Sequence, residues 1–215
     1  MDQSAVFRED SGIGIATHSE DHAMAVLPQR RSMRLPGFNY RSPGPYAFTI
    51  CNQSKMWRFA TVTPPGSMNL NPGGRMVEEM WYDIPRMFPG TISDEMVVMP
   101  NQLHGILHLG TNDISTNPDL SEVIGWLKAV TTNRYIHGVQ EHGWNRFNKV
   151  LWQRQFYDHI IRTHADFQRC QAYIGSNPVN WMSDRDREIE PQDVRKGETA
   201  HAIFGEPQGF PLPMV

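Results

Sequence analysis

The residues that could do chemistry begin with a polar pair in an otherwise apolar segment, residues 96–109 (MVVMPNQLHGILHL). The spacing predicts a strand, in which side chains two residues apart share a face. Gln102 and His104 then point one way, together with Ile106 and His108, while the leucines between them point the other way. Buried polar groups need partners. The pair is therefore either satisfied by its neighbours, which spacing alone favours, or it holds a ligand.

A second pair lies in the segment after residue 163. Tyr173 and Asn177 are four residues apart, so they lie on the same side of a predicted helix, one turn apart. A tyrosine beside a core face usually has a packing role, but its hydroxyl can also act as a nucleophile. An amide oxygen can bind a hard metal ion. If this helix packs across the strand with Gln102 and His104, the four side chains could bind a divalent cation and attack a phosphodiester.

The elements that must position these residues follow from local signals. Asn71-Pro72 and Asn117-Pro118 resemble helix starts, with Asn as the N-cap and Pro at the first helical position. Thr163 followed by Asp166 resembles a capping box. The predicted order is a strand at 46–51 in a hairpin with a strand at 57–62, a helix from 71 that fails near Pro85, a strand at 94–109, a helix from 117, a loop at 137–149, a strand at 151–162, and a helix from 163 to 177.

This order favours the α+β class, with a mainly antiparallel sheet and helices packed on one of its faces. Ferredoxin-like topologies belong to that class. The 215 residues are enough for one domain with a core. We expect a flexible acidic arm at 1–28, the domain at 29–181, and a flexible tail at 182–215.

Charge and cysteine content narrow the compartment and the partners. The central region carries a net charge of +4 between an arm of −4 and a tail of −3, which together give the total of −3. Two distant cysteines, Cys51 and Cys170, fit a reducing compartment. No apolar run approaches 18 residues, so we expect a cytoplasmic protein without a membrane span. Monomer and homodimer both stay open.

Several polar side chains are candidates for contacts with nucleic acid. An Arg-rich segment interleaved with aromatics can straddle phosphates and stack on bases, and polar groups on the late strand can reach base edges. A solvated loop, or ion pairs of Arg154 and Arg162 with Asp158 or Asp166, would explain the same residues. The DNA-binding candidates are Arg30, Arg31, Arg34, Gln153, Arg154 and His159.

Six stretches in roughly residues 30–181 resemble the REP-associated tyrosine transposases, a single-tyrosine branch of the HUH endonucleases. They occur in the family's order, and together they are far more specific than any one of them. The stretches are RRSMRLPGFNY, YAFTICNQ, MNLNPGGRMVEEMW, VVMPNQLHGILHL, LWQRQFYDHIIR and AYIGSNPVNW.

The resemblance implies a ferredoxin-like HUH-nuclease fold that cleaves and rejoins single-stranded DNA beside a hairpin. It implies that Tyr173 is the nucleophile and forms a 5′-phosphotyrosine. It also implies a Mg²⁺ or Mn²⁺ ion held by positions 102, 104 and Asn177. The family usually has histidine at the first of these positions, where this chain has Gln102. An amide oxygen coordinates less well than an imidazole held by further hydrogen bonds, so weakened metal binding is expected.

Three functional hypotheses stay open at this point. The first is a transposase-type nuclease and strand transferase that acts on hairpin-bearing DNA. The second is a hairpin-binding protein that lost catalysis through Gln102. The third, a structural or protein-interaction domain, is supported only by the low net charge.

Overall fold

The structure, a computed structural model, describes residues 34–110 and 114–181. The expected acidic arm and C-terminal tail lie outside the described residues, as do Arg30 and Arg31.

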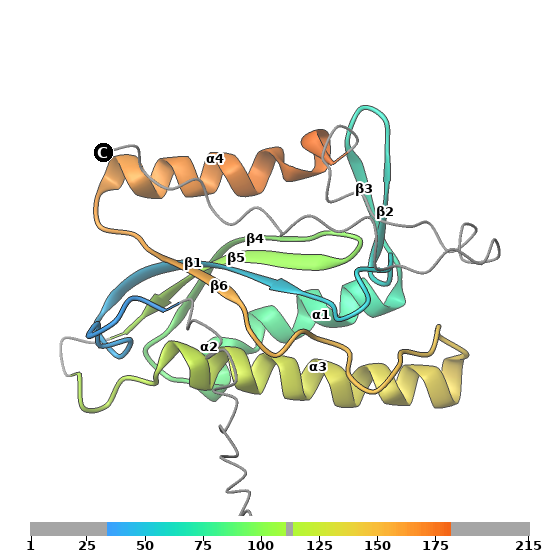
Figure 1. Cartoon of the computed structure of the whole chain (residues 1–215), viewed down its shortest axis with the longest axis horizontal. Coiled ribbons are helices and arrows are strands. Elements are labelled where there is room, and N and C mark those ends of the chain that lie inside the picture. The colour runs from blue at the N-terminus through green and yellow to red at the C-terminus, as the bar shows by residue number, and fades with distance from the viewer. Residues whose placement is uncertain (1–33, 111–113, 182–215) are drawn as a thin grey trace, which may run out of the picture. The chain divides into compact units, whose positions relative to one another are not determined.

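A four-stranded antiparallel sheet forms the middle layer of the described domain (Figure 1). The spatial order is β4-β5-β1-β6, and a separate two-stranded ribbon pairs β2 with β3. The strands are β1 (Gly44–Cys51), β2 (Ala60–Thr63), β3 (Ser67–Leu70), β4 (Ile92–Val98), β5 (Gln102–Leu109) and β6 (Tyr157–Ile160). The helices are α1 (Pro72–Tyr82), α2 (Ile84–Met87), α3 (Leu120–His142) and α4 (His164–Asn180). The expected α+β class with a mainly antiparallel sheet is confirmed.

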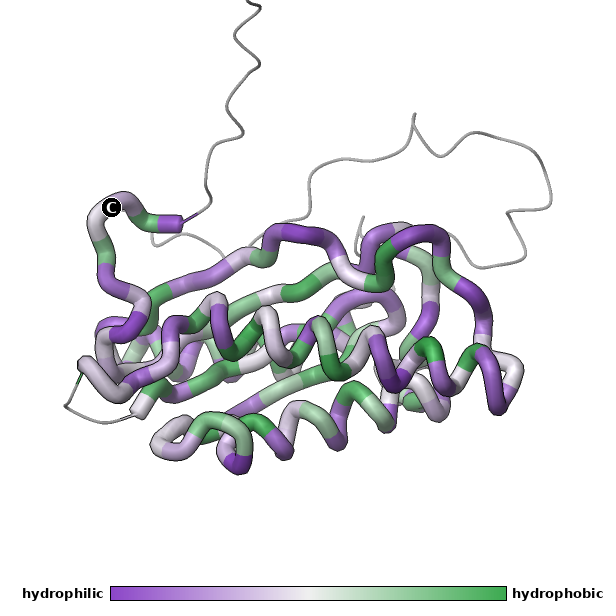
Figure 2. The backbone as a smooth tube through the Cα atoms, turned by 90° about the horizontal axis from the view of Figure 1, so that it is seen from below, coloured by the Kyte–Doolittle hydropathy of each residue, from purple (hydrophilic) through white to green (hydrophobic). Residues whose placement is uncertain are grey.

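Helices cover both faces of this sheet, so the expectation of helices on one face was wrong. α1 and α3 lie on one side, and α4 lies on the other (Figure 1). The strands β1 and β5 alternate side chains between the two sides, so Phe48 and Leu107 join the core under α1 and α3, whereas Ala47 and Ile106 pack under α4. Hydrophobic and hydrophilic residues are interspersed along the backbone of the described domain (Figure 2). No helix within the described ranges is long and apolar enough to cross a membrane.

The segment predicted as one strand over 94–109 is a hairpin of β4 and β5. The backbone N–H of Met99 donates to the carbonyl of Gln102 over 2.8 Å, which closes a tight turn at Pro100-Asn101. Apolar residues continue on both sides of this turn, so hydrophobicity alone did not separate the two strands. The predicted alternation of faces within β5 is confirmed.

The predicted hairpin between the first two strands was also wrong, because β2 pairs with β3. After β1 the chain runs to the β4–β5 turn, where the N–H groups of Arg58 and Phe59 both donate to the carbonyl of Pro100. These bonds direct β2 away from β1.

The late strand is shorter than the predicted 151–162. Thr49 pairs with Tyr157 and Asn52 with Trp152, so the later segment has extra residues between the two pairs. The carbonyls of residues 153–155 bond instead to the Lys128 ammonium at 3.0–3.2 Å. Burial lowers the pKa of this lysine to about 8. Lys128 therefore accounts for the interruption.

The helix starts predicted at Asn71 and Thr163 are confirmed, since each side chain accepts a backbone N–H in the first turn. The helix expected from 117 begins at Leu120, capped by Asp119. The predicted loop at 137–149 is wrong up to residue 142, because α3 continues to His142. Gly138 is a packing position there, since a Cβ would lie 2.2 Å from the Trp144 ring. α4 also continues through Pro178 to Asn180.

Candidate active site

The sheet face under α4 carries buried polar side chains among apolar ones. His104 on β5 lies opposite Thr49 on β1, and both are buried. The Thr49 hydroxyl and His104 Nδ1 are 2.8 Å apart and hydrogen-bonded. This bond fixes the orientation of the imidazole within the sheet.

Burial lowers the pKa of His104 to about 3, so the ring is neutral at physiological pH. Neutral imidazole is the form that binds metal ions. If Nδ1 donates its proton to the Thr49 hydroxyl, the lone pair of Nε2 is the coordinating one. The Thr49 contact is therefore of the kind that orients a histidine ligand.

Tyr173 and Asn177 on α4 lie above this part of the sheet. The rings of Tyr173 and His104 meet edge to face, with centroids 5.5 Å apart and planes at 88°. One turn later, the Asn177 side-chain N–H group donates to the Tyr173 carbonyl over 2.7 Å, and Asn177 is buried. The amide nitrogen is engaged by this bond, so the oxygen is the atom with which Asn177 could bind a ligand.

Gln102 lies at the start of β5 on the same face and is buried. Its Oε1 accepts a long, weak hydrogen bond from the Cys51 thiol at 3.6 Å. A thiol is a weak donor, so this contact leaves the amide oxygen with coordinating capacity. Two amide oxygens and a neutral imidazole are suitable donors for a hard divalent cation, so the residue types fit Mg²⁺ or Mn²⁺.

His108 shares the face but has a structural role. Its Nε2 lies 2.7 Å from a carboxylate oxygen of Asp94 on β4, and its ring meets Phe167 of α4 edge to face. His108 is therefore held by contacts within the protein.

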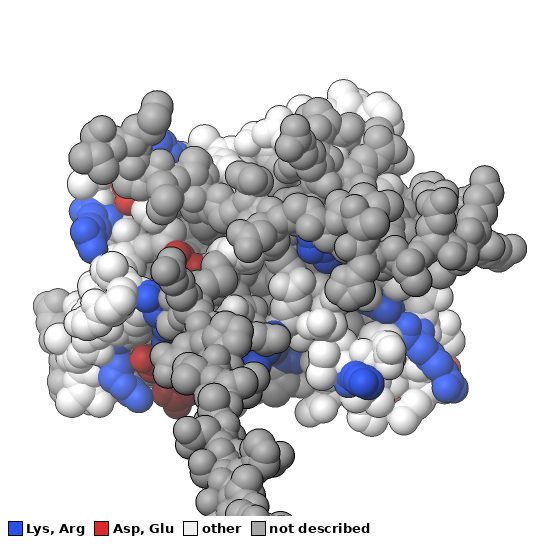
Figure 3. Space-filling view, viewed as in Figure 1, with Lys and Arg blue, Asp and Glu red and all other residues white. Residues whose placement is uncertain are grey.

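The predicted DNA contacts divide into two groups. Arg34 and Arg154 line one groove of about 590 Å³ beside α3, together with Lys128 and Phe156. The Arg34 guanidinium lies over the rings of Tyr40 and Phe156 at 4.6 and 5.3 Å. Where the view in Figure 3 is not covered by grey atoms, basic side chains occupy several separate places.

The other two candidates make contacts within the protein. Gln153 donates from its side chain to the carbonyl of Asn52 over 3.4 Å. His159 binds the carboxylate of Asp166 at 2.9 and 3.1 Å. The contact of Arg162 with Asp166 is a hydrogen bond from its backbone N–H, and not the ion pair that the alternative expected.

Three residues near these sites were missed by sequence reasoning. Thr49 could be found only once β1 and β5 are paired in register. The contacts of the Lys128 ammonium with backbone carbonyls could not be found from local sequence. Cys170 was considered for what it says about the redox compartment, whereas in the structure it lies close to His159 and Asp166.

Comparison with known proteins identifies a relative. No family model matches the sequence. A protein of Haemophilus influenzae described as uncharacterized is 34% identical in an alignment of 178 residues that covers 75% of this chain and 94% of that protein. The chain belongs to the same family as that protein. The match extends over almost the whole relative, so the two share the domain and not only a motif.

A solved structure shares the fold. The structure of a REP-associated tyrosine transposase bound to a REP hairpin has a TM-score of 0.51 and 21% identity to this chain, and the match covers 82% of this chain and 97% of that one. This family member therefore has the α+β fold of that transposase.

Proposed function

We propose that this protein is a single-stranded DNA endonuclease and strand transferase that acts at hairpin-bearing DNA through Tyr173. The observation that carries the proposal is the contact between Tyr173 and the buried, neutral His104 on the polar face of the sheet. A fold shared with a hairpin-bound tyrosine transposase supports it.

In the proposed reaction the Tyr173 hydroxyl attacks a backbone phosphorus atom. The hydroxyl gives up its proton as a Tyr Oη–P bond forms, the P–O3′ bond breaks, and the leaving 3′-oxygen takes up a proton. The product is a 5′-phosphotyrosine with a free 3′-hydroxyl, and attack by another 3′-hydroxyl reverses the step and joins two strands. The bond energy is conserved in the phosphotyrosine, so the transfer needs no nucleotide cofactor.

His104, Asn177 and Gln102 would hold a Mg²⁺ or Mn²⁺ ion. Such an ion polarises the phosphoryl oxygen and stabilises the charge that develops on it. Thr49 acts as a positioning residue through His104. Gln102 is the weak member of the set, because a flexible amide replaces an imidazole.

DNA would also contact the groove beside α3, a helix that lies on the side of the sheet opposite α4 (Figure 1). Arg34 and Arg154 supply charge and Phe156 supplies an apolar ring surface, which suits phosphates and an unpaired base. Binding of this kind weakens as the salt concentration rises, because neutralised phosphates release counterions.

A second candidate is a hairpin-DNA-binding protein that no longer cleaves. Gln102 favours it, because the amide oxygen of this residue is already in contact with the Cys51 thiol. The two candidates differ in one observable, the covalent link between protein and DNA.

The deciding experiment is an adduct assay with Mn²⁺ or Mg²⁺. The substrate is a pool of fluorescent hairpin oligonucleotides with randomised single-stranded flanks, and adducts are resolved on a denaturing gel. The proteins are the unmutated chain, Gln102→His, Tyr173→Phe and Tyr82→Phe. The last is the matched control, since Tyr82 is exposed on α1, away from the site.

We expect an adduct with the unmutated chain, a stronger one with Gln102→His, none with Tyr173→Phe, and an unchanged one with Tyr82→Phe. An adduct only in Gln102→His would mean that Gln102 silences the enzyme. Hairpin binding without an adduct in either protein would establish the second candidate. Failure to bind hairpins at low salt would contradict both.

A further inference from the structure

We propose that His159, Asp166 and Cys170 form a second metal site, which binds a thiophilic divalent ion such as Zn²⁺. The proposal is independent of the DNA chemistry and would stand if Tyr173 proved inert.

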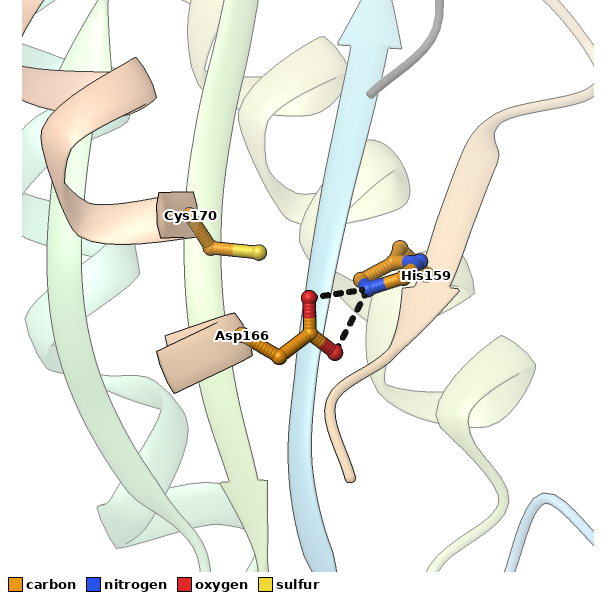
Figure 4. Close-up of side chains that lie close together, drawn as sticks. All are labelled: His159, Asp166 and Cys170. Carbon is orange, nitrogen blue, oxygen red and sulfur yellow. Dashed lines mark hydrogen bonds and ion pairs between the residues drawn. The ribbon is translucent and has the colours of Figure 1, made fainter. Parts of the chain in front are cut away.

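Two elements bring the three side chains together. His159 lies on β6, and Asp166 and Cys170 lie one turn apart on α4. One ligand atom from each, a ring nitrogen, a carboxylate oxygen and the thiol sulfur, lies within 4.8 Å of the other two. The side chains point toward one another in the space between α4 and the sheet (Figure 4).

This donor set selects a particular class of metal. A thiolate, an imidazole and a carboxylate are all ligands of Zn²⁺, with bonds of about 2.0 to 2.3 Å. Mg²⁺ and Ca²⁺ prefer all-oxygen surroundings and would not use the sulfur. Small rotations of the side chains would bring the three atoms to the spacing of a tetrahedral site, with one position left for water.

The site has access to solvent on one side. His159 and Asp166 line a groove of about 700 Å³, and their side chains are 17% and 13% exposed. Cys170 lies deeper, 4% exposed. An ion can therefore arrive through the groove, reach the imidazole and carboxylate first, and then meet the sulfur.

The bonds already present are compatible with a bound ion. Asp166 Oδ1 also accepts from Arg169 at 3.0 Å, and Oδ2 accepts from the Arg162 N–H. A carboxylate has about four lone-pair sites, so these bonds can persist while the ion replaces the direct contact with His159. The thiol gives its proton to solvent on binding. Burial raises the pKa of Cys170 to about 11, so without a cation this sulfur stays protonated.

Cobalt provides a spectroscopic test, because Co²⁺ substitutes for Zn²⁺ and a cobalt–thiolate bond gives near-ultraviolet charge-transfer absorption. The full reduced chain is titrated with Co²⁺, followed by competition with Zn²⁺. We expect one thiolate-bound Co²⁺ per chain, displaced by Zn²⁺. Cys170→Ser removes the band, and His159→Gln weakens binding by about tenfold or more.

Cys51→Ser is the matched control. The chain has two cysteines, both buried, and Cys51 contacts Gln102 rather than this cluster. The band should survive Cys51→Ser. A band that survives Cys170→Ser and disappears in Cys51→Ser would overturn the proposal, as would cobalt binding without any thiolate absorption, which would identify binding by other histidines.

Thermal unfolding provides a second readout in case Cys170→Ser folds poorly. A ligand that binds only the folded state raises the unfolding midpoint. Zn²⁺ should raise the midpoint of the unmutated chain and of Cys51→Ser, and raise it less in His159→Gln. Equal shifts in all three proteins, or none in the unmutated chain, would contradict the site.

Discussion

The two faces of the central sheet are built from the same strands but have different chemistry. The face under α1 and α3 belongs to a large apolar cluster that includes Trp81, Phe48 and Leu107. The face under α4 has a much smaller apolar cluster around Ala47, Ile106 and Ile174, beside buried His104 and Gln102. Alternation along β1 and β5 assigns each residue to one face.

The two faces therefore have different roles, since one mainly stabilises the fold and the other carries the polar groups proposed for chemistry. Apolar burial is the main favourable term in folding, and one face provides most of it. Buried polar groups cost free energy unless they are paired. The face under α4 can carry them because the other face stabilises the sheet on which both depend.

The largest effect is expected on the apolar face. Trp81 is fully buried against Phe48, and its ring would lie 2.9 Å from a Cβ placed at Gly105. Trp81→Ala should lower the free energy of unfolding by about 3–5 kcal/mol, as expected for loss of a large buried aromatic. Urea denaturation measures this. A loss below about 1 kcal/mol would show that this face is not the main source of stability.

Acid should affect the polar face through His104. Its pKa is about 3 in the folded chain against the ordinary value of 6.5 for histidine, so the unfolded chain binds more protons between these values. This contribution to stability is complete above pH 6.5 and is lost as the pH falls, by up to about 1.4 kcal/mol per pH unit.

His104→Gln isolates the contribution of His104 to the pH dependence of the free energy of unfolding, since the other titrating groups are common to both proteins. The free energies of unfolding of the two proteins, measured by urea denaturation from pH 7 to 4, should converge as the pH falls. Parallel curves would mean that His104 is not kept neutral by burial.

A buried threonine can be replaced by valine on each side of the sheet. Thr49 bonds to His104, and Thr131 accepts from the Trp152 indole N–H at 2.8 Å on the other side. Thr49→Val and Thr131→Val should each cost about 1–3 kcal/mol in urea denaturation, because each leaves a buried polar group without this partner. Only Thr49→Val should also reduce adduct formation. Equal loss of adduct in both would indicate a general effect of instability.

The smallest difference is expected at two helix caps. Asn71 accepts from Gly74 N–H and donates to the carbonyl of Arg58, whereas the Thr163 hydroxyl accepts the exposed N–H of Asp166. Asn71→Ala should cost about 1–2 kcal/mol and Thr163→Ala about 0.5 kcal/mol, measured by thermal unfolding. The reverse order would mean that α4 contributes more to stability than its small cluster indicates.

Local signals predicted the helix starts at Asn71 and Thr163 and the two faces of β5, because caps and alternation depend on neighbouring residues. The strand partners were not predictable in this way, since β2 is directed by the carbonyl of Pro100, far along the chain. Gly138 was predicted to lie in a loop, because the Trp144 ring that leaves no room for a side chain at this position lies outside the helix.

The candidate residues were recognisable in the sequence, but their geometry was not. Residue types and spacing singled out His104, Tyr173 and Asn177 as candidates, and the family resemblance implied their roles. The contact between Tyr173 and His104 depends on how α4 lies across the sheet. The position of α4 across the sheet also brings His159, Asp166 and Cys170 together. Sequence spacing could not predict this cluster, because its members come from a strand and a helix.

The two ends of α4 are attached by different forces. Near its start, Asp166 is hydrogen-bonded to His159 and forms an ion pair with Arg169, while at its end Trp181 is buried and its ring centroid lies 6.2 Å from that of Trp57. Acid that protonates Asp166 therefore loosens the beginning of the helix first, whereas urea, which weakens apolar contacts, loosens its end. The composition of the solvent thus selects the end from which the helix that carries Tyr173 detaches.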